Sequence, residues 1–230
     1  MPHAIVFGAR NLGGAILDRL LADGWTATGV ARSEDTLAAV RERGADAVAA
    51  DATDPGAVEE VLRSVPRVDL AVNAAASYGG SGAFGGGPIA EADLDGFEGW
   101  AAMPARQAFV FLSACARVLG PGSTIVQCTG GSARRANPGR GLWAAGAFGV
   151  RAITQAAALE LRESGVHVCL LMIDGTIESP KTAAFTEGQP AEALVDQADV
   201  AAAVAYLASQ TGRAMTHELQ VTPAGDRWLP

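Results

Sequence analysis

The sequence is poor in basic residues and has no long apolar run. Of its 230 residues, 17 are Lys or Arg and 25 are Asp or Glu, which gives a formal net charge of −8. This acidic balance argues against non-specific nucleic-acid binding, which needs clustered basic residues to displace counterions. No apolar stretch reaches the roughly 20 residues of a membrane-spanning helix, and no basic leader precedes the first apolar segment. We therefore expect a cytoplasmic protein without a membrane span.

Cysteine is also scarce, and its three positions form no pattern typical of metal ligands or redox partners. Cys115, Cys128 and Cys169 lie far apart on apolar stretches, without a CxxC motif. They predict small reduced core residues and no metal site. With 49% hydrophobic and 18% charged residues, the composition is that of one globular domain over residues 1–230.

The chain does contain a regular alternation of short apolar runs and amphipathic helical runs. Strands are expected near residues 3–7, 25–31, 46–50, 68–73, 123–129, 166–173 and 218–222, and helices near 14–22, 34–43, 55–64, 105–119, 144–163 and 197–209. Such alternation is typical of right-handed crossovers between parallel strands. The predicted fold class is α/β, a Rossmann-type doubly wound, mostly parallel seven-stranded sheet with helices on both faces. Two loops, near 77–93 and 174–196, fit no regular element and are expected to form the walls of the substrate site.

Polar residues and one proline predict where several helices begin or break. Asp54 precedes a proline and is expected to cap a helix, as are Ser33 and Asp196. Pro104 is expected to break or kink the helical region around it, because proline lacks the backbone N–H and clashes with the preceding turn.

The first predicted strand runs directly into a glycine-rich turn. Gly8 ends the strand, and Gly13 and Gly14 open the following helix. Small residues here let a pyrophosphate approach the backbone at the helix N-terminus, where unpaired N–H groups favour an anion. Glycine also ends strands for purely structural reasons. The order of strand, turn and helix at the N-terminus nevertheless favours a dinucleotide site.

Charged residues after the second and third strands indicate which dinucleotide would bind. Arg32 follows the second strand, where an Asp or Glu would accept the 2′-hydroxyl of NAD(H). Its guanidinium suits a 2′-phosphate, and Arg10 in the glycine turn adds to the same charge, so NADP(H) is favoured over NAD(H). The alternative is that both arginines are solvated surface residues. Asp51, after the third strand, either accepts from the adenine amino group or is an ordinary turn residue.

These segments, in this order, resemble the short-chain dehydrogenase/reductase family over essentially the whole chain. The family's Gly-x-x-x-Gly-x-Gly pattern is matched by Gly8, Leu12 and Gly14, with its middle glycine replaced. Its Asn-Asn-Ala-Gly after the fourth strand corresponds to residues 73–76, and its Pro-Gly turn after the sixth strand has Asp174 in place of proline. The resemblance implies a cofactor site formed by Gly8, Arg10, Asn11, Leu12, Gly14, Arg32, Asp51, Ala52, Asn73, Ala74, Ala75, Ile177 and Ser179.

The same resemblance identifies a missing proton relay. Oxidoreductases of the family use a tyrosine as general acid/base, a lysine four residues later that lowers the tyrosine pKa, an upstream serine and often an asparagine in the preceding long helix. Here Trp143, Ala147 and Gly130 stand at the first three positions, and no asparagine is found at the fourth. An indole N–H donates a hydrogen bond but exchanges no proton near neutral pH. The usual relay is therefore excluded.

Other hydroxyl groups are weak candidates for the proton donor. Tyr78 lies in the first substrate loop, and Thr129 and Ser132 lie next to the family's serine position. The alternative for Tyr78 is a loop aromatic that packs on the rim of the site. Tyr206, the second of two tyrosines, is expected to be a core residue of the last helix.

Charged residues near the expected substrate cleft have two possible roles. The three arginines of one loop either bind a carboxylate or phosphate or are solvated loop residues; they are Arg134, Arg135 and Arg140. Asp174 and Glu178 either act as acid or base or cap a turn. His167 is expected to be a structural histidine of an apolar strand, and His217 belongs to no catalytic cluster.

Three functions are compatible with these residues. The first is an atypical NADP(H)-dependent oxidoreductase of a small carbonyl or enone compound, with water or a hydroxyl as proton source. The second is a non-redox lyase, isomerase or cyclase. The third is a catalytically inactive nucleotide-binding partner subunit. The resemblance also implies a homodimer or homotetramer formed through the helices near 105–119 and 144–163.

Overall fold

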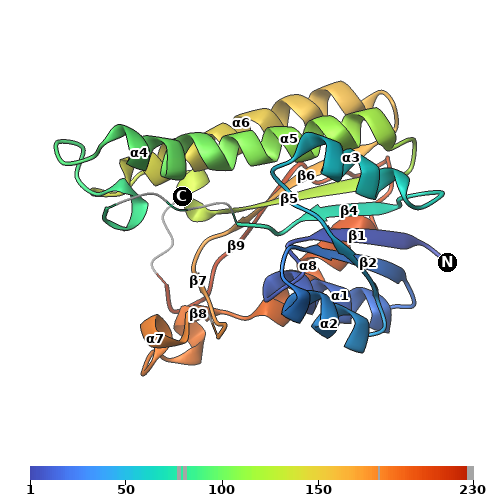
Figure 1. Cartoon of the computed structure of the whole chain (residues 1–230), viewed down its shortest axis with the longest axis horizontal. Helices are drawn as coiled ribbons and strands as arrows, with labels where there is room; N and C mark the ends of the chain where they lie inside the picture. Colours follow the sequence, from blue (N-terminus) through green and yellow to red (C-terminus); the bar gives the residue numbers. More distant parts are fainter. Residues whose placement is uncertain (77–78, 80–81, 181, 227–230) are drawn as a thin grey trace.

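The computed structural model describes residues 1–76, 79, 82–180 and 182–226, and the predicted sheet lies at its centre (Figure 1). Seven strands pair in the order β3-β2-β1-β4-β5-β6-β9, and all neighbours are parallel. The strands are β1 (His3–Phe7), β2 (Thr26–Ala31), β3 (Asp46–Ala49), β4 (Leu70–Asn73), β5 (Thr124–Gly130), β6 (His167–Ile173) and β9 (Glu218–Val221). Each predicted strand is confirmed, with ends that differ by no more than two residues.

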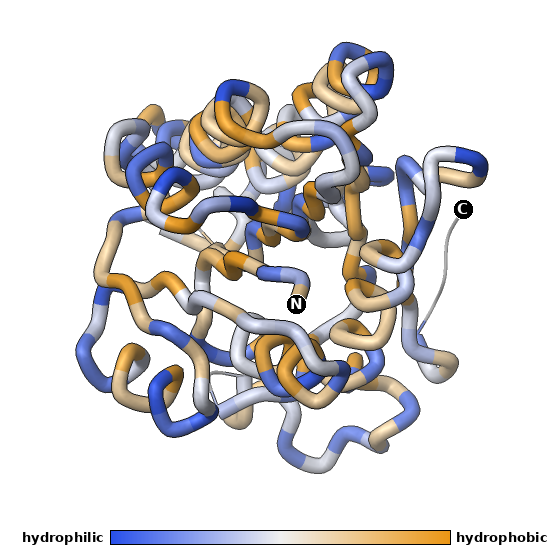
Figure 2. Tube along the Cα trace, turned by 90° about the vertical axis from the view of Figure 1, so that its right-hand side faces the viewer, coloured by the Kyte–Doolittle hydropathy of each residue, from blue (hydrophilic) through white to orange (hydrophobic). Residues whose placement is uncertain are grey.

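Helices cover both faces of the sheet, as the predicted fold class requires. One face carries α1 (Leu12–Ala22), α2 (Glu34–Glu42) and α8 (Gln197–Ala208), and the other carries α3 (Pro55–Arg63), α5 (Met103–Val118) and α6 (Gly141–Arg162) (Figure 1). Figure 2 shows the hydrophobic parts of the strands running between these two helical layers. The sequence pattern therefore predicted the layers correctly.

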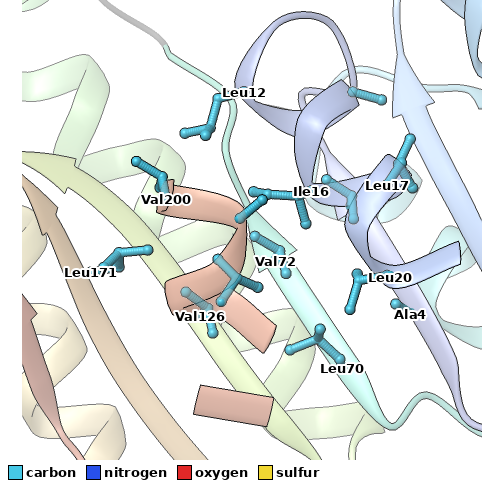
Figure 3. Close-up of a cluster of buried hydrophobic side chains, with 14 of the residues drawn as sticks. Ala4, Leu12, Ile16, Leu17, Leu20, Leu70, Val72, Val126, Leu171 and Val200 are labelled. Atoms are coloured by element: carbon cyan, nitrogen blue, oxygen red, sulfur yellow. The ribbon is translucent and has the colours of Figure 1, made fainter. Parts of the chain in front are cut away.

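Each face of the sheet has its own hydrophobic core. The strands are apolar on both sides because both sides are covered by helices. Under α1 and α8, Leu12 and Val200 pack near Val72 of the sheet (Figure 3). On the opposite face, Phe7 and Phe111 pack edge to face, with ring centroids 5.6 Å apart. The cores fix the strand ends, from which the functional loops leave.

Two of the three predicted helix caps are present. Asp54 accepts two backbone N–H groups at the start of α3, and Asp196 accepts one at the start of α8. Ser33 precedes α2, but its hydroxyl bonds to the hydroxyl of Thr36 instead of a backbone N–H. A side-chain contact has replaced the expected cap there.

The chain remains helical on both sides of Pro104, and only the type of helix changes just before it. The short helix α4 (Leu94–Phe97) continues through the π-helical turn η2 (Glu98–Ala102) into α5. Proline supplies no N–H to the carbonyls of the preceding turn. The carbonyl oxygen of Trp100 lies against α6, where a Cβ added to Gly146 would be 2.5 Å from it. The wide turn thus packs tightly on the neighbouring helix.

The two expected substrate loops contain short elements. The described part of the first holds the 3-10 turn η1 (Phe84–Gly86). The second holds α7 (Ala183–Thr186), η4 (Ala191–Ala193) and the parallel pair β7 (Thr176–Ile177) and β8 (Leu194–Val195). In Figure 1, α4 and α7 stand at the edge where the strands of the sheet end. Among the described residues, no helix has both the length and the apolar character to cross a membrane.

Candidate active site

A cavity of about 550 Å³ opens at the carboxyl ends of the strands. The residues that follow β4, β5 and β6 form its walls, together with Phe84 and side chains between residues 135 and 143. The connections from β1 and β4 leave this edge where the strand order reverses. Open α/β sheets bind their ligands at this switch point.

The turn after β1 is in direct contact with the chain that follows β4. Gly8 has φ +83°, a conformation that L side chains rarely adopt. A Cβ added there would lie 2.5 Å from the N and Cα atoms of Ala75. The N–H groups of Gly8 and Ala9 both donate to the carbonyl of Val30, which ties the turn to β2. Asn11 precedes α1, and its side chain makes no cap bond.

Of the two glycines at the start of α1, Gly13 is the crowded one. A Cβ added to Gly13 would overlap the carbonyl oxygen of Gly8, whereas one added to Gly14 would face the side chain of Arg43 at 3.2 Å. Leu12 is buried and also lines the cavity. Gly13 therefore supplies the close approach of helix and strand.

The side chains expected at the adenosine end lie outside the cavity, at the carboxyl ends of β2 and β3. The guanidinium of Arg32 is 3.9 Å from the carboxylate of Asp51, and 77% of the Arg32 side chain is exposed. The N–H and hydroxyl of Thr53 donate to the other Asp51 oxygen and lower the pKa of this carboxyl. Arg10 is exposed and has no ion pair with any described residue, and Ala52 packs on the core.

Asn73 shapes the turn after β4 and does not line the cavity. It is buried, its Nδ2 donates to Oε1 of Gln127 at 3.0 Å, and its Oδ1 accepts the N–H of Ala75 at 3.2 Å. Ala74 donates its N–H to Phe7 at the end of β1. Ala74 and Ala75 do line the cavity, where their small side chains leave space.

Of the two residues expected at the cofactor in the last loop, Ile177 lines the cavity and Ser179 lies in a neighbouring pocket. Thr182 takes the place next to Ile177. Its hydroxyl donates to the Ile177 carbonyl at 2.6 Å and accepts the N–H of Ser179 at 3.0 Å. The sequence gives no signal for Thr182, because the turn that brings it back depends on three local hydrogen bonds.

Trp143 and Gly130 face each other in the cavity. A Cβ added to Gly130 would be 3.9 Å from Cζ2 of the Trp143 indole. This is the arrangement required if the two residues stand at the family's tyrosine and serine positions. Ala147, one turn later on α6, is fully buried with Val150 and Leu170. Helix α6 contains no lysine.

Ser132 is the expected hydroxyl donor that lines the cavity with a half-buried side chain. Thr129 also belongs to the lining, but its Oγ1 is closed off from solvent and has no hydrogen-bond partner among the described residues. Tyr78 lies outside the described residues. Tyr206 is 55% exposed on α8, so its expected core role is wrong.

A buried ion pair occupies the cavity beside Gly131. Arg135 donates to both carboxylate oxygens of Asp174, at 2.8 and 2.9 Å, and Asp174 is almost fully buried. Gln220 of β9 donates to Asp174 and accepts from Arg134, each at 2.8 Å. Hydrogen bonding to Asp174 raises the pKa of Arg135. A Cβ on Gly131 would overlap the carboxylate.

In this network, three of the charged candidates are already bonded to other protein groups. Arg135 is committed to Asp174, and Arg134 is committed to Gln220. Asp174 is committed to Arg135 and Gln220. Glu178 lines the neighbouring pocket and not the cavity.

The third arginine of the loop, Arg140, rests on aromatic rings. Its guanidinium carbon is 5.2 Å from the Phe84 ring centroid and 5.7 Å from that of Trp143. Phe84 packs edge-on against Trp143 and Trp100, with centroids 4.8 and 5.1 Å apart. We call Phe84, Trp100 and Trp143 the aromatic wall. Arg140 forms no side-chain hydrogen bond or ion pair within the described part of the chain.

The histidines and cysteines supply no reactive group to this cavity. His167 and His217 each bond a backbone carbonyl, and burial lowers the pKa of His167. Cys128 is in the lining, but burial raises the pKa of its thiol to about 12. No group of three potential metal ligands is found among the described residues.

Known proteins resemble this chain over nearly its full length. A family model described as enoyl-(acyl carrier protein) reductase matches residues 8–225. A blue fluorescent protein from a metagenomic library, in complex with NADPH, is 26% identical, with 97% of each chain covered and a TM-score of 0.81. A short-chain dehydrogenase from Burkholderia cenocepacia, in complex with NADP, is 26% identical, with 96% of each chain covered and a TM-score of 0.79. A variant of actinorhodin polyketide ketoreductase with NADPH is 25% identical, with 98% of each chain covered and a TM-score of 0.77. No curated protein sequence matches significantly.

Gly131→Ala is predicted to destabilise the protein by about 1–3 kcal/mol, because its Cβ displaces the Asp174 carboxylate from Arg135. Gly130→Ala is the matched control, since its Cβ meets no atom closer than 3.9 Å. Urea unfolding followed by circular dichroism measures both. Asp174→Ala should cost less in the Gly131→Ala background than in the wild type. Equal costs in the two backgrounds would contradict the overlap.

Proposed function

Because the chain belongs to the short-chain dehydrogenase/reductase family, we propose that it is an atypical NADP(H)-dependent oxidoreductase that reduces the C=C bond of a small α,β-unsaturated carbonyl compound. One observation carries the proposal: Trp143 faces Gly130 where the family's oxidoreductases would have their tyrosine and serine. The chain keeps features that suit the cofactor and lacks those that protonate a carbonyl oxygen. A reaction that does not need this protonation fits such a site.

Residues at the first turn fit a dinucleotide with a 2′-phosphate. Gly8 lets the turn after β1 pack on the Ala75 backbone, which brings Leu12 at the start of α1 to the cavity. Arg10 and Arg32 are exposed at the expected adenosine end and supply positive charge. Three similar structures contain NADPH or NADP, which supports the same choice here. When bound, the reduced cofactor supplies a hydride.

The missing relay favours a conjugated C=C bond over a simple carbonyl as the hydride acceptor. Hydride addition to a ketone leaves an alkoxide, which needs a positioned acid in the transition state. Addition at the β-carbon of an enone moves the C=C electron pair toward the carbonyl and gives a delocalised enolate. Water can then protonate the α-carbon in a separate step. The oxygen of the enolate is much less basic than that of an alkoxide, because its charge is shared with the α-carbon, so the reaction needs no acid positioned at the carbonyl oxygen and the loss of the tyrosine costs it less.

We assign Ser132 as the hydrogen-bond donor to the carbonyl oxygen of the substrate. It lines the cavity two residues after Gly130, and its hydroxyl can donate to a developing oxyanion. Thr129 is not assigned this role because its Oγ1 is closed off from solvent. Arg135 adds a positive charge to the same wall, although Asp174 balances most of it. Trp143 then orients the apolar part of the substrate and excludes water.

A catalytically inactive partner subunit is the second candidate. The replacement of tyrosine and lysine by Trp143 and Ala147 favours it, and so do the exposed apolar side chains of α5 and α6. A non-redox lyase, isomerase or cyclase remains the third, without a particular side-chain arrangement in its favour. NADPH binding and NADPH consumption distinguish the oxidoreductase from a protein that binds the cofactor without turnover.

Arg32→Ala is predicted to weaken NADPH binding about 10- to 100-fold, because a charge-assisted hydrogen bond contributes about 1.5–3 kcal/mol. NADH binding should not change, since it has no 2′-phosphate. Isothermal titration calorimetry measures both ligands, and Arg63→Ala is the control, because Arg63 pairs with Glu59 on α3. Equal affinities of the wild type for NADPH and NADH would contradict the role of Arg32.

The wild type is predicted to consume NADPH with cyclohexenone and not with cyclohexanone, as measured by stopped-flow absorbance. Ser132→Ala should slow the enone reaction about 100-fold, the usual loss for one oxyanion donor, while Thr129→Val should leave it unchanged. Faster consumption with cyclohexanone would refute the preference for C=C reduction. NADPH binding without turnover of any enone would favour the inactive partner.

The chain is further proposed to form a homodimer or homotetramer through α5 and α6. Phe109 on α5 and Phe148 and Leu159 on α6 are exposed large apolar side chains. Phe148→Glu is predicted to shift the mass measured by light scattering toward the monomer, because burying this charge in an interface is costly. Phe185→Glu on α7 is the control, as Phe185 is also exposed but far along the chain from these helices. A monomeric wild type would refute this proposal.

A further inference from the structure

We propose that Arg140 and the aromatic wall bind a carboxylate carried by an apolar substrate. The cavity would therefore select an acid whose apolar body extends from Arg140 along Trp143 toward Gly130. The inference names a substrate class for the proposed function and rests on it for the reaction. Binding of the acid can be tested without any reaction.

The guanidinium of Arg140 has the chemistry and the freedom to bind an anion. Its guanidinium carbon lies 5.2 Å from the Phe84 ring centroid and 5.7 Å from that of Trp143, within the range of a cation–π interaction. The N–H donors point outward in the guanidinium plane, in a fork that matches the two oxygens of a carboxylate. No described residue provides that carboxylate. A carboxylate of a ligand can therefore accept these hydrogen bonds.

The backbone around Arg140 holds it in place before a ligand arrives. Gly87 forms a β-bridge with Arg140. A Cβ on Gly85 would be 3.0 Å from Cγ of Arg140, and one on Gly86 would be 2.7 Å from Leu142. Both glycines have positive φ angles, so the turn packs directly on the arginine's stem. Such preorganisation reduces the entropy that ligand binding would cost.

The other charges in the cavity favour a singly charged ligand. Arg135 and Asp174 neutralise each other in a bidentate pair. Asp226 also lines the cavity, and its negative charge acts on Arg135. Arg140 is thus the cation of the described lining that no carboxylate balances, and it offers a single positive charge. A carboxylate fits this balance better than a phosphate dianion.

Trp143 determines which acids fit. Its indole contacts Arg140 on one side, and its Cζ2 atom faces Gly130 on the other. A substrate with its carboxylate at Arg140 and its reactive group near Gly130 must lie along this ring. We therefore expect an unsaturated carbonyl compound whose carboxylate is separated from the double bond by an apolar spacer about as long as an aromatic ring.

Calorimetric titration with hydrocinnamate and hydrocinnamamide tests the site, because the two probes differ in charge and neither can be reduced. Hydrocinnamate is expected to bind about tenfold tighter to the wild type, with or without NADP⁺. Arg140→Gln should bring the acid-to-amide ratio close to one, and Arg140→Lys should retain part of it. Arg134→Gln is the matched control from the same loop and should keep the wild-type ratio, because Arg134 is bonded to Gln220.

The ratio also controls for damage to the fold, since a distorted cavity weakens both probes. Equal binding of acid and amide by the wild type, or an unchanged ratio in Arg140→Gln, would overturn the site. Tighter binding of phenyl phosphate than of hydrocinnamate would overturn the choice of a carboxylate. Because the titrations contain no hydride donor, a protein that binds the acid but never consumes NADPH would keep the site and lose the proposed reaction.

Discussion

The close contact between two backbone segments, at Gly8 and Ala75, is the constraint on which the site depends. A Cβ at Gly8 would lie 2.5 Å from the Ala75 backbone. The segments that follow β1 and β4 can therefore lie this close only because residue 8 has no side chain. This approach sets the strand ends at the switch point and brings the start of α1 to the cavity. Asn73 holds the same turn from the other side through its bonds to Gln127 and Ala75.

In the opposite half of the cavity, the position of each lining residue depends on its neighbours. The Asp174 carboxylate lies where a side chain of residue 131 would stand, and Arg135 binds it with two donors. Trp143 fills the space across from Gly130, and Phe84 packs on the indole. Ala147, one turn after Trp143, is fully buried, so a longer side chain there would have to displace its neighbours. Substitution at one position therefore changes the fit of its neighbours.

The sequence predicted the strands, the helices and the crowded Gly8, because hydrophobic periodicity and a glycine at a strand end are local signals. It could not separate Gly13 from Gly14, since only the packed position of the Gly8 carbonyl distinguishes them. It also treated the arginines of one loop alike. Their difference arises from contacts distant in sequence: Asp174 lies 39 residues from Arg135, whereas the guanidinium of Arg140 lies beside the rings of Phe84 and Trp143.

The π-helical turn Glu98–Ala102 sets the direction in which Trp100 of the aromatic wall points. A wide turn accommodates one extra residue, and each residue in a helix changes the direction of its side chain by about 100°. The turn therefore acts as a phase shift: α5 keeps its buried face on the sheet, while Trp100 points toward Phe84, 5.1 Å away between ring centroids. Deleting one residue from this turn would rotate the indole out of the wall without altering any residue of the wall itself.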